Sequence, residues 1–143
     1  MIDTETDQVL RFAAVIGGSF EKPLLRHVVH RAEDSLDRML HTATSSGVLR
    51  AEATRYRFRD NAIRLEFYRG LDEAVRCGVH RRVAVVLKST GADAARIAHH
   101  LVAALPYSSA EEALRYTLEA GRASLDHSEA VALFAQALKL VER

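Results

Sequence analysis

The chain has 143 residues, of which 48% are hydrophobic and 27% are charged, and its formal net charge is +1. This balance is ordinary for a globular protein with a core, and it gives no whole-chain attraction to nucleic acid or an anionic membrane. Cys77 is the only cysteine, which excludes an internal disulfide and a cysteine-rich metal site and fits a reducing compartment. No apolar run approaches the roughly 20 residues that cross a bilayer. We therefore expect a cytoplasmic, non-membrane protein with one large domain or two small ones.

An amphipathic helix is predicted over residues 7–16, because apolar side chains recur on one of its sides. Thr4 or Thr6 is expected to cap this helix by accepting a backbone N–H bond. Gly17 and its neighbour end the helix, since glycine tolerates positive φ. Phe20 is expected to fill the core after that turn.

Two further helices are predicted before residue 48. One starts near Glu21, with Pro23 tolerated in its first turn. The next starts near Glu33 and ends at Gly47. Its apolar side chains follow i, i+3, i+4, i+7 spacing and are Leu36, Met39, Leu40 and Ala43.

A β-hairpin is predicted to follow, with strands at residues 48–51 and 56–58. Because side chains alternate along a strand, Tyr56 and Phe58 should face the core. The opposite side, which we call the basic hairpin face, is made by Arg50, Arg55, Arg57 and Arg59. Arginine binds phosphates and carboxylates in a bidentate way, so this face is interpreted either as a contact surface for an acidic group or as a solvated strand face.

The remainder of the chain is predicted to be helical. The expected helices cover residues 60–69, 72–88, 92–105, 109–125 and 128–142. Asp126 or Ser128 is expected to cap the last helix, which should pack antiparallel to the one before it because the turn is short. The fold class is thus mainly α. A winged helix-turn-helix with a two-stranded hairpin is expected over residues 1–70, and a helical, tetratricopeptide-like region over residues 71–143.

Short sequences along the chain resemble, in order and spacing, the region that follows the nucleotide-binding core in STAND-type signal-transduction ATPases. This group includes large LuxR-family transcription regulators of the MalT type. The segments similar to their winged-helix domain are LRFAAVIGGSF (10–20), SGVL (46–49) and YRFR (56–59). Those similar to their helical region are HRRVA (80–84), IAHHL (97–101) and ALRY (113–116), and SEAVALF (128–134) is similar to the second helix of a tetratricopeptide repeat.

The resemblance implies a non-catalytic segment that relays signals between a nucleotide-binding core and helical sensor repeats. Its implied partners are that core and the adjacent repeats, together with a protein partner or a second copy of the chain. No Gly-x-x-x-x-Gly-Lys-Ser/Thr sequence is present, so ATP or ADP would belong to a core outside this chain and no cofactor is expected here. The chain is then expected to be an internal segment of a longer protein. Repeats bury their faces on neighbours, and the implied contact residues of the tail are Leu133, Phe134 and Leu138.

In related switch ATPases, a histidine that opens the helix after the wing touches the β-phosphate of ADP. By resemblance, the corresponding position in this sequence is Asp60. A carboxylate beside a phosphate is repulsive unless a metal lies between them. Any phosphate contact implied by the resemblance would therefore fall to Arg59 or Arg64.

The alternative function is a free-standing winged-helix DNA-binding transcription regulator with a helical dimerisation tail. The arginines of the hairpin favour it. However, Glu33, Asp34 and Asp37 lie near the leading end of the third helix and would repel the DNA backbone, so DNA binding through this segment is not expected. In a third hypothesis, the tail simply dimerises through the apolar face of its last helix.

No catalytic or metal-binding residues are expected. The sequence has no Gly-x-Ser-x-Gly nucleophile elbow and no pair of acidic residues that stands out as catalytic. His27 and His30 lie three residues apart, and His99 and His100 are adjacent, but neither pair has a recognisable third ligand. The sequence therefore predicts contact rather than chemistry.

Overall fold

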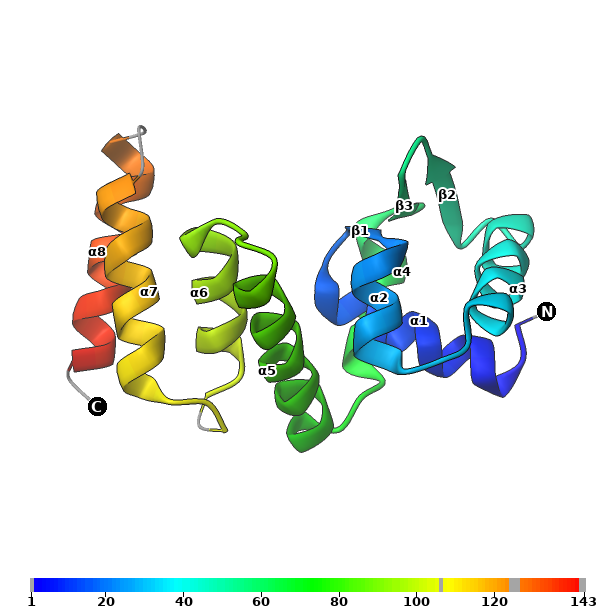
Figure 1. The fold of residues 1–143 in the computed structure, drawn as a ribbon, viewed down its shortest axis with the longest axis horizontal. Helices are drawn as coiled ribbons and strands as arrows, with labels where there is room; N and C mark the ends of the chain where they lie inside the picture. Colours follow the sequence, from blue (N-terminus) through cyan, green and yellow to red (C-terminus); the bar gives the residue numbers. More distant parts are fainter. Residues whose placement is uncertain (1, 106, 124–126, 142–143) are drawn as a thin grey trace. The chain divides into compact units, whose positions relative to one another are not determined.

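The computed structural model describes residues 2–105, 107–123 and 127–141, which form a mainly helical protein with one small antiparallel sheet (Figure 1). The chain divides into two compact units, residues 1–79 and residues 80–143. The division falls within helix α5 (Glu73–Ser89), whereas the predicted domain boundary is at residue 70. Among the described residues, no helix combines the length and apolarity that crossing a bilayer requires.

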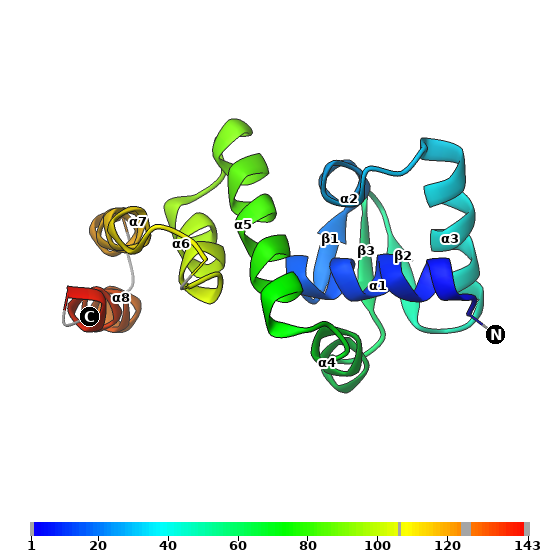
Figure 2. The same ribbon diagram turned by 90° about the horizontal axis from the view of Figure 1, so that it is seen from below.

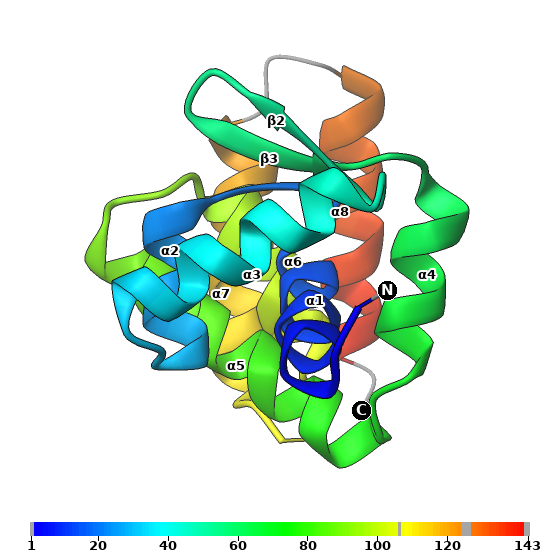
Figure 3. The ribbon, with the colours of Figure 1, turned by 90° about the vertical axis from the view of Figure 1, so that its right-hand side faces the viewer.

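The first unit contains four complete helices and three short strands. In chain order they are α1 (Thr4–Ile16), β1 (Ser19–Glu21), α2 (Lys22–Val29), α3 (Glu33–Ser45), β2 (Leu49–Glu52), β3 (Arg55–Phe58) and α4 (Asn61–Arg69). Helix α1 lies at the centre, with α2 and α3 on one side and α4 on the other (Figures 2 and 3). Its buried side chains include Val9, Leu10, Ala13 and Ile16, as its apolar spacing predicts.

The sheet has three strands rather than the predicted two, in the order β1-β3-β2. Strand β1 pairs with β3 in antiparallel register, which places Phe20 opposite Tyr56. The two rings stack at 6.0 Å between centroids, and Phe20 is also 6.0 Å from Phe58. Phe20 is fully buried, as predicted. The prediction missed β1 because a three-residue strand has too few side chains to display an alternation.

The N-terminus of α1 is capped by Asp3, not by Thr4 or Thr6. The backbone N–H of Thr6 donates to Asp3 Oδ1 at 2.7 Å, and this hydrogen bond holds the pKa of Asp3 below its usual value. The helix begins three residues earlier than predicted. Asp3 can cap it because its own backbone is extended while its carboxylate reaches forward to the first turn.

The second unit consists of the second half of α5 and three further helices, α6 (Ala94–Ala103), α7 (Ala110–Ala123) and α8 (His127–Val141). Helix α7 packs against both α6 and α8. Gly121 allows the close approach of α7 and α8, because a Cβ atom there would lie 2.9 Å from the ring of Phe134. The predicted cap at Asp126 lies outside the described residues.

Candidate functional site

The basic hairpin face lies on the outer side of the sheet, and its residues form two rows. Paired residues of antiparallel strands point to the same side, so Arg50 of β2 lies opposite Arg57 of β3 in the first row. In the second row, Arg55 lies between Glu21 and Glu52, its partners on the two neighbouring strands. The two glutamates outweigh the one arginine of the second row, and the positive charge of this face is therefore concentrated in the first row.

The orientation of the hairpin follows the sequence pattern. Phe58 is buried and Tyr56 half-buried, whereas Arg55, Arg57 and Arg59 are exposed. Directly opposed like charges destabilise a strand pair, and here the repulsion is relieved in part by Glu52, whose Oε1 lies 3.8 Å from Arg57 Nη1.

A cleft of about 240 Å³ lies where β3 meets the start of α4. Its lining includes Arg57, Arg59, Asp60 and Arg64. The structure thus brings together the three residues of the predicted nucleotide-sensor position, one of which, Arg59, also belongs to the basic hairpin face, and a second arginine of that face, Arg57. Three guanidinium groups and one carboxylate give the lining a net positive charge. Such a set can bind a carboxylate or phosphate group through charge-assisted hydrogen bonds.

Asp60 has a local role at this cleft, because it caps helix α4. Its Oδ1 accepts the backbone N–H of Ile63 at 2.9 Å, and its Oδ2 lies 3.6 Å from Arg59 Nε. The carboxylate of Asp60 therefore occupies the position at the start of α4 where an anionic ligand would otherwise accept hydrogen bonds from the helix N-terminus.

Arg64 links two helices of the first unit. Its Nη1 donates to the carbonyl oxygen of Ala14 at 3.1 Å, which joins α4 to α1. A second link runs the other way, since Arg11 Nη1 of α1 donates to the carbonyl oxygen of Gly70 at the end of α4, at 2.7 Å. Neither link was foreseen, because both partners are backbone carbonyls more than 45 residues away in the sequence.

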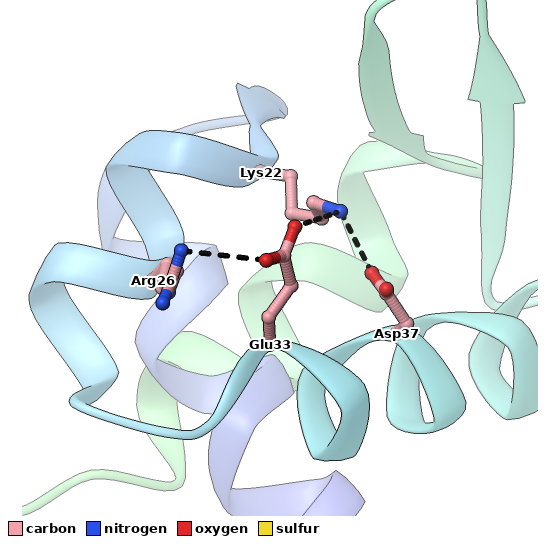
Figure 4. Close-up of polar contacts among 4 residues, drawn as sticks. All are labelled: Lys22, Arg26, Glu33 and Asp37. Atoms are coloured by element: carbon pink, nitrogen blue, oxygen red, sulfur yellow. Dashed lines mark hydrogen bonds and ion pairs between the residues drawn. The ribbon is translucent and has the colours of Figure 1, made fainter.

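The acidic side chains at the start of α3 are paired with bases of α2 (Figure 4). Lys22 Nζ lies 2.8 Å from Asp37 Oδ1 and 3.4 Å from Glu33 Oε1, and Arg26 Nη1 lies 3.6 Å from Glu33 Oε2. The hydrogen bond to Asp37 raises the pKa of Lys22. The acids of α3 were predicted from the sequence, but their pairing with Lys22 and Arg26 was not. These pairs neutralise part of the negative charge at the start of α3.

The predicted contact residues of the tail differ in exposure. Phe134 and Leu138 of α8 are 41% and 61% exposed, whereas Leu133 is less exposed and is half-buried. Val131 is 54% exposed and was missed. Its spacing of i, i+3 and i+7 with Phe134 and Leu138 is the signal that could have found it.

A buried histidine pair lies inside the second unit. His80 Nδ1 of α5 and His100 Nδ1 of α6 are 2.8 Å apart, and the two residues are 2% and 1% exposed. Burial, and then the neighbouring His80, His99 and Arg96, lowers the pKa of His100 to about 3. His100 is therefore neutral at ordinary pH, and both side chains pack within the core. The described residues contain no group of three or more His, Cys, Asp or Glu side chains arranged to hold a metal ion.

No protein-family model, curated protein or solved structure matches this chain.

Proposed function

We propose that this chain is a non-catalytic regulatory and protein-interaction segment of a signal-transduction ATPase that regulates transcription. On this proposal the first unit is a winged helix that contacts the nucleotide-binding core. The second unit begins a tetratricopeptide-like array that receives the signal. Both the core and the further repeats would lie outside the residues of this chain.

The observation that carries the proposal is the order of elements in the first unit. Three helices and three strands follow one another as α1-β1-α2-α3-β2-β3, with β3 central in the sheet. This order is the one expected of a winged helix, in which the last two strands form the wing. The antiparallel helices α7 and α8 support the tetratricopeptide-like interpretation of the tail, because such repeats are stacked helix pairs.

The charges of α3 favour an intramolecular role over DNA reading. In a DNA-bound winged helix, α3 would enter the major groove and approach the phosphates. Here its first turns carry Glu33, Asp34 and Asp37, and two of these acids are held in place by Lys22 and Arg26. Moving them against a phosphate backbone would break these pairs and add repulsion.

The proposal is tested first with ATP. The purified chain should neither bind nor hydrolyse ATP, because the phosphate-binding loop belongs to the absent core. Isothermal titration with Mg-ATP and a phosphate-release assay measure this directly. Turnover that disappears in an Arg59→Ala variant would contradict the proposal, and Arg69→Ala, at an exposed arginine of α4 outside the cleft lining, serves as the control.

The second test separates the proposal from its alternative, a DNA-binding regulator. A mobility-shift titration with random and genomic DNA at several salt concentrations should give only weak binding without sequence preference. Tight, specific binding with a steep salt dependence, weakened by Arg57→Ala, would establish the alternative instead.

A further inference from the structure

The cleft between β3 and α4 contains an arginine whose position is fixed by the fold. Arg64 is half-buried. Its Nε donates to Asn61 Oδ1 at 3.1 Å, and its Nη1 donates to the carbonyl oxygen of Ala14 at 3.1 Å. Its Nη2 has no hydrogen-bond partner among the described residues. Because the guanidinium plane is already held, its remaining N–H groups can bind an anion with little further loss of side-chain freedom.

The first row of the basic hairpin face is a second position that favours an anion. Arg50 and Arg57 are direct cross-strand partners, and both are exposed. Like charges in this arrangement destabilise the free hairpin, and an anion between them would remove that cost. A local conflict of this kind is expected at a functional site rather than in a purely structural one.

The two anion positions are separated by a strand repeat. Arg57 and Arg59 are two residues apart, so they lie on the same side of the strand. The strand geometry extends to Arg59, whose backbone N–H donates to the carbonyl oxygen of Val48 at 2.9 Å. Two residues of an extended chain span about 6.8 Å. An extended peptide therefore presents its own side chains i and i+2 at the spacing that separates the first row from the cleft.

The second row limits the length of the segment that this face can bind. Arg55 lies between Glu21 and Glu52, so this row is negatively charged. A third acidic side chain, continuing the same spacing toward the hairpin turn, would meet these two glutamates and be repelled. The charges of the face thus fit two acidic side chains, one at the first row and one at the cleft.

The lining of the cleft favours a carboxylate over a phosphate. Asp60 is part of that lining, and its Oδ1 accepts the backbone N–H of Ile63 at 2.9 Å. The donors at the start of α4 that would help to hold a phosphate are therefore in use. The charge of Asp60 also repels a doubly charged phosphate more strongly than a singly charged carboxylate.

The surroundings of the site favour a protein segment over a nucleic acid. Single-stranded nucleic acids stack their bases on exposed aromatic rings. The aromatic rings of this hairpin face inward, since Phe58 is buried and Tyr56 stacks on Phe20. Residues 1–79 also contain as many acidic as basic residues, so the first unit gives no long-range attraction to a polyanion.

We propose that the cleft and the first row form one docking site for an extended, acidic segment of a protein partner, with its two acidic residues two positions apart. One carboxylate binds Arg59 and Arg64, and the other binds the first row. The inference rests on the proposed function for the source of the segment, which is then the nucleotide-binding core. The binding chemistry itself depends only on residues of the first unit.

An NMR titration of the isotope-labelled chain with the peptide acetyl-Thr-Glu-Thr-Glu-Thr-amide at low salt tests the proposal. Two carboxylates should give a dissociation constant on the order of 1 mM, with the largest amide shifts at residues 57–61. The matched peptide acetyl-Thr-Thr-Glu-Glu-Thr-amide has the same composition and charge, but adjacent side chains of an extended chain point to opposite sides. It should bind at least threefold more weakly, and equal affinities would overturn the proposed spacing.

Substitutions on the protein test the site itself. Arg59→Gln should raise the dissociation constant of the first peptide at least fivefold. Arg69→Gln, at an exposed arginine of α4 outside the cleft lining, is the control and should leave it unchanged. Arg57→Gln should also weaken binding, yet the free chain should be at least as stable in urea, because the opposed charges of the first row are removed. A purely structural arginine would instead lower stability and leave binding unchanged.

Other outcomes would overturn the proposal. They are the absence of binding at about 10 mM peptide, and unchanged binding by Arg59→Gln. Tighter binding of inorganic phosphate, or of an oligothymidylate, would assign the site to a phosphate group or to a nucleic acid instead. Failure to bind the peptide leaves the ATP test of the proposed function unaffected. ATP turnover by the chain would end the proposed function without changing the result of the peptide titration.

Discussion

The buried pair of His80 and His100 predicts that the second unit is sensitive to acid. A hydrogen bond between two Nδ1 atoms 2.8 Å apart holds one hydrogen, so one ring donates and the other accepts. Protonating the accepting ring would remove the bond and place a charge in the core. Burial opposes this charge most, followed by the neighbouring His80 on α5 and by His99 and Arg96 on α6.

The size of the effect follows from the pKa of His100, which falls from 6.5 in a model peptide to about 3 in the fold. Below pH 6.5, His100 binds a proton in the unfolded chain but not in the folded chain. The free energy of unfolding therefore decreases as the pH falls. The decrease approaches about 1.4 kcal/mol per pH unit and ends near pH 3, where the folded chain is protonated as well. Between pH 7 and pH 5 the expected loss is about 2 kcal/mol.

Urea denaturation at pH 7 and pH 5 measures this loss, and backbone amide exchange in α6 and α7 locates it in the second unit. The informative variant is His100→Asn, whose side-chain amide occupies the position of Nδ1 and does not titrate. It should retain at pH 5 the stability that the wild type loses. His41→Asn, at an exposed histidine of the first unit, is the control and should lose as much as the wild type. Equal losses in His100→Asn and the wild type would refute the reasoning.

Three further substitutions test local features by urea denaturation. Gly121→Ala should lower the free energy of unfolding by about 1 kcal/mol, since its Cβ would lie 2.9 Å from the Phe134 ring. In a Phe134→Ala background the same change should be neutral or stabilising. Equal costs in both backgrounds would contradict the clash. Ala53→Gly should raise the free energy of unfolding by about 0.5–1 kcal/mol, because Ala53 has a φ of +37° in the hairpin turn; a loss would show that this turn is not strained. Asp60→Ala should cost about 1 kcal/mol through the lost cap on the Ile63 N–H, and Asp60→Asn should restore most of it.

Much of the first unit could be predicted from local pattern. The stripe of Leu36, Leu40 and Ala43 predicts α3, and all three side chains are buried. The alternation at Tyr56 and Phe58 predicts which side of the hairpin faces the core. These predictions succeed because helix and strand periodicities are properties of neighbouring residues, and they are encoded wherever one face is buried.

The candidate sites could be predicted only in part. The arginines of the hairpin were visible in the sequence, since their exposure follows from the alternation of side chains along a strand. Of the exposed apolar residues of α8, Phe134 and Leu138 were named and Val131 was missed. Their partners were not visible. Nothing local indicates that Glu52 would accompany Arg57, or that Arg64 would be bound to Ala14.

The sequence by itself determined where the helices and the hairpin form and which of their faces are apolar, because those features depend on residues within a few positions of one another. Only the tertiary structure decided that Ser19–Glu21 joins the hairpin as a third strand, that Lys22 meets Asp37, and that His80 meets His100. Each of these contacts joins segments that are distant in the sequence and that the path of the backbone brings together. Local patterns of side chains do not specify which distant segments meet.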